Sequence, residues 1–186
     1  MKLKKILASI YKWVQEMPFE TNLTNGQNYH EKIKYILINK RGSCSPKHYL
    51  LGSVYENLNI QLLFLTHPFY WHDLEVDYSR HIKKLAAKMP ISYHLALQIG
   101  LEGENILIDA TWDSPLEKAG FNVNHIKEEI QNTHLAVKPC ESCIVHATAA
   151  ERDNFIRRLK SQRIFDPQVA QDFYNALNVW MNSLRK

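Results

Sequence analysis

The sequence predicts an α+β fold, with helices first, a small antiparallel sheet in the middle and helices again at the end. Two observations support it: apolar residues recur at helical spacing in both terminal regions, and apolar, aromatic-rich segments flank a turn in the centre. A length of 186 residues suits one domain with its own core. Hydrophobic residues make up 45% and charged residues 23%, which is typical of a globular protein.

The first segment is predicted to form an amphipathic helix that packs on the domain. Lys12 interrupts the apolar run, and no small-residue cleavage site follows, so a signal peptide is not indicated. A helix lying on a membrane surface remains the alternative. No stretch approaches the roughly 18 apolar residues of a membrane span. The residues at helical spacing are Leu3, Ile6, Leu7, Ile10 and Val14.

Two further helices are expected before the sheet, over residues 29–39 and 44–58, because apolar residues recur there every three or four positions. Ser43 or Ser45 can cap the second helix. Cys44 is therefore expected at or next to a helix N-terminus.

The clearest strands are residues 91–99 and 105–111, which are joined by a hairpin turn over 100–103. An apolar and aromatic run over residues 60–66 predicts another strand, and residues 135–137 suggest a further short one. Residues 67–78 and 112–133 are expected to be loops, while 80–88, 147–162 and 167–184 are expected to be helical.

Three residues, in this order along the chain, are candidate catalytic residues: Cys44, His94 and Asp109. A thiol, an imidazole and a carboxylate are the parts of a cysteine nucleophile, its base and the group that orients the base. A helix N-terminus favours the thiolate through its unpaired N–H groups and partial positive charge. The alternatives are a small buried cysteine and a purely structural His–Asp pair.

The hairpin brings His94 and Asp109 to the same face of the sheet. If the turn is centred between Leu101 and Glu102, paired residue numbers sum to 203, and the two residues stand directly opposite. If the sum is 205, Asp109 faces Ala96 and His94 is its diagonal neighbour. Either register lets the carboxylate reach the ring.

These segments resemble the transglutaminase-like superfamily, a papain-like group of cysteine enzymes. The resemblance rests on Gly42-Ser43-Cys44 opening a helix, His94 on one strand and Asp109-Ala110-Thr111-Trp112 on the next, and it covers roughly residues 30–115. It implies Cys44 as nucleophile, His94 as general base and acid, and Asp109 as orienter, without a cofactor. Arylamine acetyltransferases, which share the order of the three residues, are usually longer.

We expect one transglutaminase-like domain over residues 1–186, with a core at about 30–137 and a C-terminal helical extension at about 147–186. The resemblance implies amide or acyl chemistry: a peptidase, deamidase or acyltransferase acting on a protein, a peptide or a small amide or acyl compound. The alternative is an inactive fold used as a binding module. Scattered basic residues and a net charge of +4 favour neither a nucleic-acid nor a membrane partner. Three cysteines, an odd number, argue against a disulfide framework and favour the cytoplasm.

Several other side chains are weighed as site-lining residues. Asn39 could supply a side-chain donor to an oxyanion hole beside the backbone N–H of the cysteine, or be a loop amide. His48 lies one helical turn after the cysteine and could line the site or face solvent. Tyr93 and Trp112 could form walls of a cleft or belong to the core, and Trp71 could overhang it.

A second constellation is Cys140, Cys143 and His146, in which two cysteines have Cys-x-x-Cys spacing. A zinc site would need a fourth ligand, for example His134 or Glu141. A redox pair would normally open a helix after a strand. We interpret these residues as structural thiols first and as metal ligands or a redox pair second.

Overall fold

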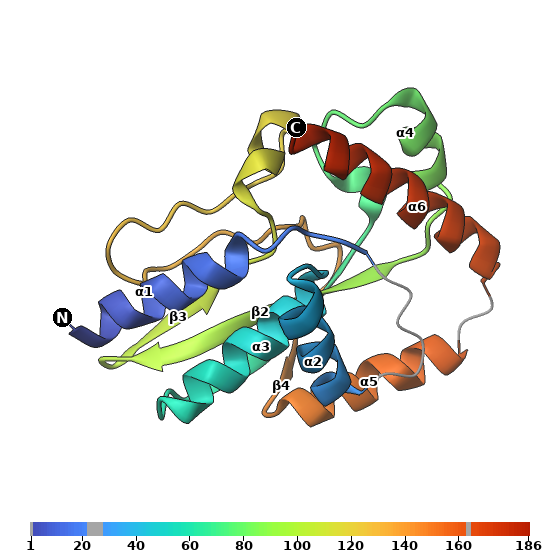
Figure 1. Cartoon of the computed structure of the whole chain (residues 1–186). Coiled ribbons are helices and arrows are strands. Elements are labelled where there is room, and N and C mark those ends of the chain that lie inside the picture. Colours follow the sequence, from blue (N-terminus) through green and yellow to red (C-terminus); the bar gives the residue numbers. More distant parts are fainter. Residues whose placement is uncertain (1, 22–27, 163–164) are drawn as a thin grey trace.

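The computed structural model describes residues 2–21, 28–162 and 165–186 and has the predicted α+β architecture. Helices precede and follow a central sheet, and two short 3-10 helices lie in the connections, as Figure 1 shows. The elements are α1 (Lys2–Gln15), α2 (Tyr29–Asn39), α3 (Cys44–Asn57), β1 (Leu62–Phe69), η1 (Trp71–Asp73), α4 (Arg80–Ala86), β2 (Ser92–Leu101), β3 (Glu104–Ile108), η2 (Ser114–Ala119), β4 (Ile144–His146), α5 (Ala149–Gln162) and α6 (Pro167–Leu184).

The sheet has four antiparallel strands in the order β3-β2-β1-β4. Its short edge strand is β4, not the predicted segment 135–137. That segment forms no ladder because its backbone bonds elsewhere: the N–H of Ala136 donates to the Asp109 carboxylate at 2.8 Å, and the carbonyl of Leu135 accepts from Asn122 at 3.1 Å. The strand β1 also continues to Phe69, past the expected start of a loop at residue 67, because it stays paired with β2.

The β2–β3 hairpin selects the second of the two predicted registers. Leu97 pairs with Ile108, so paired numbers sum to 205. Glu102 and Gly103 form the two-residue turn with φ values of 54° and 85°. Two successive left-handed residues suit a type I′ turn, whose twist matches that of the strands. Asp109 therefore follows the last residue of β3, diagonal to His94.

Apolar side chains form two clusters, and the helices divide between them. The first cluster joins α1, α2 and α3 to the sheet and includes Tyr11, Tyr55 and Phe64, all 0% exposed. The second lies under α4, α6, η1 and η2, which Figure 1 shows at one end of the molecule, and includes Trp112 and Phe173.

Helix α1 packs on the domain as predicted, but with a narrower buried face. Leu7, Tyr11 and Val14 are buried, whereas Leu3 and Ile6 are 39% and 49% exposed. The lysines at the start of the helix reach solvent alongside them. None of the helices in the described ranges combines the length and apolar character that crossing a membrane requires.

Candidate active site

Cys44 is the first residue of α3. Ser43 is the N-cap in extended conformation, and its side chain makes no capping hydrogen bond. The chain just before it is fixed, because Gly42 exchanges backbone hydrogen bonds with Pro18 and Glu20. The first N–H groups of α3 have no partner within the helix. The half-buried thiol therefore lies beside donors that can stabilise a negative charge.

His94 and Asp109 form a buried pair. The His94 ring nitrogen Nε2 lies 2.7 Å from Asp109 Oδ2, and the residues are 2% and 1% exposed. Asp109 also accepts from the hydroxyl and N–H of Thr111, at 2.6 and 3.2 Å, and from the Ala136 N–H at 2.8 Å. Burial raises the pKa of Asp109, but the His94 charge and these hydrogen bonds hold it well below its usual value.

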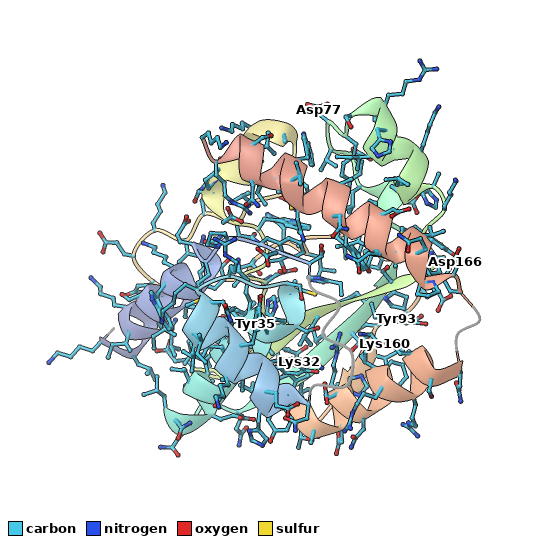
Figure 2. The ribbon with its side chains drawn as sticks, turned by 45° about the vertical axis from the view of Figure 1, so that its right-hand side comes forward. Lys32, Tyr35, Asp77, Tyr93, Lys160 and Asp166 are labelled. Atoms are coloured by element: carbon cyan, nitrogen blue, oxygen red, sulfur yellow. The ribbon has the colours of Figure 1, made fainter. Side chains whose placement is uncertain are left out.

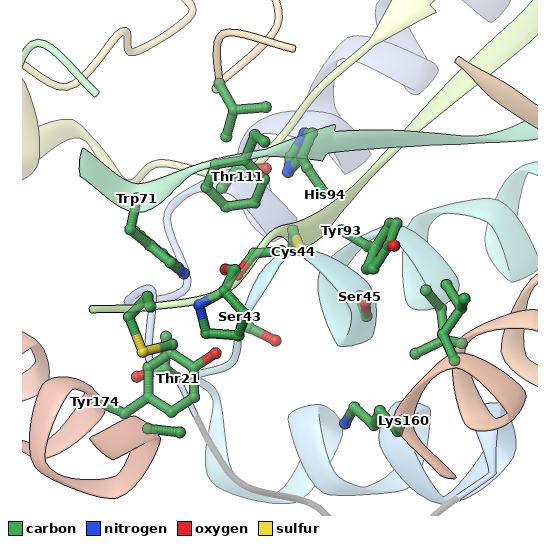
Figure 3. A pocket seen from close by; sticks show the side chains of 18 of the residues that line it. Thr21, Ser43, Cys44, Ser45, Trp71, Tyr93, His94, Thr111, Lys160 and Tyr174 are labelled. Carbon is green, nitrogen blue, oxygen red and sulfur yellow. The ribbon is translucent and has the colours of Figure 1, made fainter. Parts of the chain in front are cut away.

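Cys44 and His94 line the same cleft, and each shifts the pKa of the other, so the thiol lies beside the imidazole (Figure 3). Since Nε2 faces Asp109, the other nitrogen, Nδ1, is left for the sulfur. Burial raises the pKa of Cys44, but the His94 ring and its charge, the charge of Arg152 and the Leu95 N–H together bring it below the usual value. Burial lowers the pKa of His94, and Asp109 and Cys44 more than reverse this. The arrangement favours thiolate and imidazolium.

His48 is a buried neighbour of the site and does not face solvent. Its Nδ1 lies 2.8 Å from the Cys44 carbonyl, and its Nε2 accepts from the Ala110 N–H at 3.0 Å. Because Nε2 accepts, the proton is on Nδ1, which donates to the carbonyl. Burial lowers the pKa of His48 to about 4, so the ring is neutral near pH 7. It joins the helix of the nucleophile to the segment after Asp109.

Of the other predicted lining residues, the structure places three at the cleft and one away from it. Tyr93, Trp112 and Trp71 line the cleft that contains the thiol, although Trp112 is also part of the second apolar cluster. Asn39 does not: it is exposed at the end of α2, and its amide donates to the Tyr35 carbonyl at 2.9 Å. Figure 2 shows Tyr93 on β2, near the region where α2 and α5 approach the sheet.

The cleft has a volume of about 340 Å³. Cys44 and His94 lie at its inner end, and Figure 3 shows Trp71 and Tyr174 on one side and Lys160 on another. The C-terminal helices supply an entire wall. Their lining residues recur at helical spacing, so each helix turns one face to the cleft: Arg152, Ile156, Leu159 and Lys160 on α5, and Pro167, Ala170 and Tyr174 on α6.

The second constellation does not assemble into a metal site. Cys140 and Cys143 are both free thiols at exposed positions. Cys143 Sγ lies 3.8 Å from His67 Nε2, whereas His146 Nε2 lies 3.2 Å from the Thr66 hydroxyl. Across the part of the chain that the structure describes, no group of three or more His, Cys, Asp or Glu side chains could hold a metal ion.

Sequence reasoning did not predict that two basic residues of this region are buried. Arg152 is buried beside the nucleophile, and a single arginine in a polar helix gives no hint of that. Lys47 is 0% exposed on α3, and its ammonium donates to the carbonyls of Gln15 and Thr111, both at 2.8 Å. Burial lowers the pKa of Lys47 to about 7. Lysines are rarely buried, so sequence reasoning places them at the surface.

No protein-family model matches the sequence, and no curated protein matches it. Among solved structures, the chain is similar to a protein from Cytophaga hutchinsonii described as a candidate cysteine protease. The TM-score is 0.40, the identity is 15%, and the alignment covers 75% of this chain. The alignment spans 41% of that protein's chain.

Proposed function

We propose that the protein is a cysteine-nucleophile enzyme that acts on amide or acyl bonds through Cys44, His94 and Asp109. The observation that carries the proposal is the buried, hydrogen-bonded pair of His94 and Asp109, with Cys44 at a helix start lining the same cleft as His94. Each residue meets the requirement of its role: a thiol at a helix start, a base beside it, and an orienter.

The papain-like, transglutaminase-like type is our proposal for the class. Three features support it: the cysteine opens helix α3, that helix packs across β2 of an antiparallel sheet, and the histidine and aspartate come from β2 and the end of β3. We further propose that the substrate is a protein, a peptide or a small amide or acyl compound. The enzyme would work in a reducing compartment, the cytoplasm, because attack needs a free thiol.

The proposed reaction has two steps. The Cys44 thiolate attacks the carbonyl carbon, and N–H groups at the start of α3 stabilise the oxyanion. His94 gives its proton to the leaving amine or alcohol as the carbon–heteroatom bond breaks, which leaves a thioester. His94 then takes a proton from water or an acceptor amine, which attacks the thioester and releases Cys44 as thiolate. Asp109 holds the ring and its charge throughout.

The shape of the cleft bears on the acyl group. The lining is largely apolar and includes the aromatic residues Phe69, Trp71 and Trp112, and Ile156. A volume of about 340 Å³ lies at the small end of the range for ligand pockets. We therefore propose an acyl group with an apolar side chain.

The test is the pH dependence of alkylation of Cys44 by iodoacetamide, followed by mass spectrometry in wild type and in His94→Ala. We expect an apparent pKa below the free-cysteine value of about 8.5 in wild type, lost in the variant. Cys140 and Cys143 serve as internal controls, because burial raises the pKa of each thiol. A Cys44 that titrates as an ordinary thiol in both proteins would favour an inactive binding module.

The second test of the proposed function measures turnover, once a substrate has been found by screening amides and thioesters. Cys44→Ala should abolish turnover, because Cys44 is the only cysteine among the described residues that line the cleft. Thermal unfolding should stay close to wild type, since the change removes one half-buried sulfur atom. Full activity of Cys44→Ala would show that the nucleophile is assigned wrongly.

A further inference from the structure

Arg152 brings a positive charge from helix α5 into the interior beside the candidate active site. Its side chain is among the largest that are fully buried, with 1% of the residue exposed. It nevertheless borders the same cleft as Cys44 and His94. A guanidinium stays protonated at every pH at which proteins are folded, so this charge is permanent.

The hydrogen bonds of Arg152 reach the elements that present the nucleophile and its base. Nη1 donates to Ser45 Oγ at 2.9 Å and to the Tyr49 hydroxyl at 3.2 Å, both on α3. Nη2 donates to the Tyr93 carbonyl on β2 and Nε to Thr66 Oγ1 on β1, each at 3.3 Å. Two of these partners, Ser45 and Tyr93, are the sequence neighbours of Cys44 and His94, and both line the same cleft (Figure 3).

All four partners are electrically neutral. Among the described residues, no carboxylate forms an ion pair with Arg152; the adjacent Asp153 pairs instead with Lys32 and, at 3.3 Å, with Arg157. Hydrogen bonds satisfy the donors of a buried guanidinium but leave its charge uncompensated, which is costly in a low-dielectric interior. A negative charge nearby in the working state would remove that cost.

The catalytic cluster supplies such a charge. Asp109 is negative and His94 positive, and these two compensate each other across their 2.7 Å contact. A Cys44 thiolate then adds one further negative charge. We propose that Arg152 is a positioning residue whose charge balances the Cys44 thiolate and whose hydrogen bonds hold α3 against β2. This inference rests on the proposed function.

Among the described residues, the other buried groups around Cys44 either are neutral, are only partly charged or are paired with a carboxylate. The three buried histidines other than His94 are neutral at pH 7, because burial lowers the pKa of His48 and His67 to about 4 and also lowers that of His146. Burial raises the pKa of the Tyr49 phenol, so it is neutral too. Lys47, with a pKa of about 7, is only partly charged, and its ammonium faces carbonyl groups. Two further lysines border the cleft: Lys32 is paired with Asp153, and Lys160 is exposed to solvent on α5.

Three substitutions on α5 separate the charge from the hydrogen bonds. Arg152→Gln removes the charge, Arg152→Lys keeps it with fewer donors, and Arg158→Gln removes an exposed charge from the same helix as the matched control. We expect the alkylation midpoint of Cys44 to rise by about one pH unit in Arg152→Gln. It should stay near wild type in Arg152→Lys and be unchanged in Arg158→Gln. Circular dichroism checks that each variant is folded.

The outcomes separate this inference from the proposed function. An ordinary Cys44 in wild type would overturn the proposed function itself. The alkylation midpoint of Cys44 could be low in wild type and raised in His94→Ala, but unchanged in folded Arg152→Gln. That result would overturn only the role of Arg152. If Arg152→Gln does not fold, Arg152→Lys decides: a midpoint near wild type supports the charge, and one raised by about one unit or more contradicts it.

Discussion

At the scale of single residues, the site depends on side chains whose hydrogen bonds are fully used. Asp109 accepts from His94, from Thr111 twice and from Ala136, so its orientation is fixed from several sides. His48 is held between the Cys44 carbonyl and a backbone N–H in its neutral form. Each group is buried in one protonation state, so the stability of the folded site depends on pH.

The first prediction is a loss of stability in mild acid caused by His48 and His67. Burial lowers the pKa of both to about 4, from an ordinary value of 6.5. The unfolded chain therefore binds more protons between these pH values, so stability falls as pH drops from about 6.5 to 4. The loss should be of the order of 2–3 kcal/mol per histidine. Urea unfolding at several pH values measures it.

The control for this prediction is His81→Gln, which changes an exposed histidine on α4 and should leave the pH slope unchanged. The double variant His48→Gln and His67→Gln should be less stable at pH 7 but flatter between pH 6.5 and 4. Asp109 acts in a separate pH range. Its pKa is lowered in the folded protein, so the stability that it contributes is lost only as pH falls below about 4. An unchanged slope in the double variant would contradict the assignment.

At the scale of elements, the position of α3 against the sheet decides whether the thiol meets the imidazole. Gly52, two turns after Cys44, allows this close approach: a Cβ there would lie 3.1 Å from Phe64 Cζ and 3.7 Å from Leu97 Cδ1. Phe64 and Leu97 are both 0% exposed in the first apolar cluster, so neither has free space to move into. The glycine is therefore a packing requirement of the helix–sheet contact.

The second prediction concerns Gly52→Val. The new side chain should push α3 away from β1 and β2, lower the free energy of unfolding by about 2 kcal/mol and slow alkylation of Cys44 at pH 7. Ser53→Val is the matched control, because it introduces the same β-branched residue at the next, partly exposed position of the helix. Equal effects of the two variants would show that helix propensity, and not the contact with the sheet, is responsible. Denaturant unfolding and alkylation rates measure both.

At the scale of the whole molecule, the C-terminal helices are joined to the catalytic region. Helix α6 places Phe173, Leu177 and Met181, all 0% exposed, in the second apolar cluster. Just beyond it, Arg185 forms two hydrogen bonds with Asp113, at 2.7 and 2.8 Å. Asp113 also accepts from the Phe19 N–H at 2.7 Å, so the segment after α1 and the residue after α6 meet at the segment after Asp109.

The third prediction is that Arg185→Ala destabilises the whole protein. It leaves Asp113, which is 1% exposed, as a buried charge without its partner, and such a loss costs about 3–5 kcal/mol. Lys186→Ala, the neighbouring exposed residue, should have almost no effect. Adding Asp113→Asn to Arg185→Ala should restore part of the stability, because the unpaired charge is gone. A loss below 1 kcal/mol, measured by denaturant unfolding, would contradict this account.

The sequence by itself determined most of the helices, the central hairpin and the shared face of His94 and Asp109. Helical spacing, capping residues and a two-residue turn act over a few positions, so they can be read along the chain, and strand numbering limited the hairpin to two registers. The tertiary structure decided between those registers, turned Asn39 away from the site and buried His48. It also placed Arg152 of α5 beside Ser45, more than a hundred residues away in the chain. Such contacts depend on how distant helices pack, and no short-range pattern encodes that.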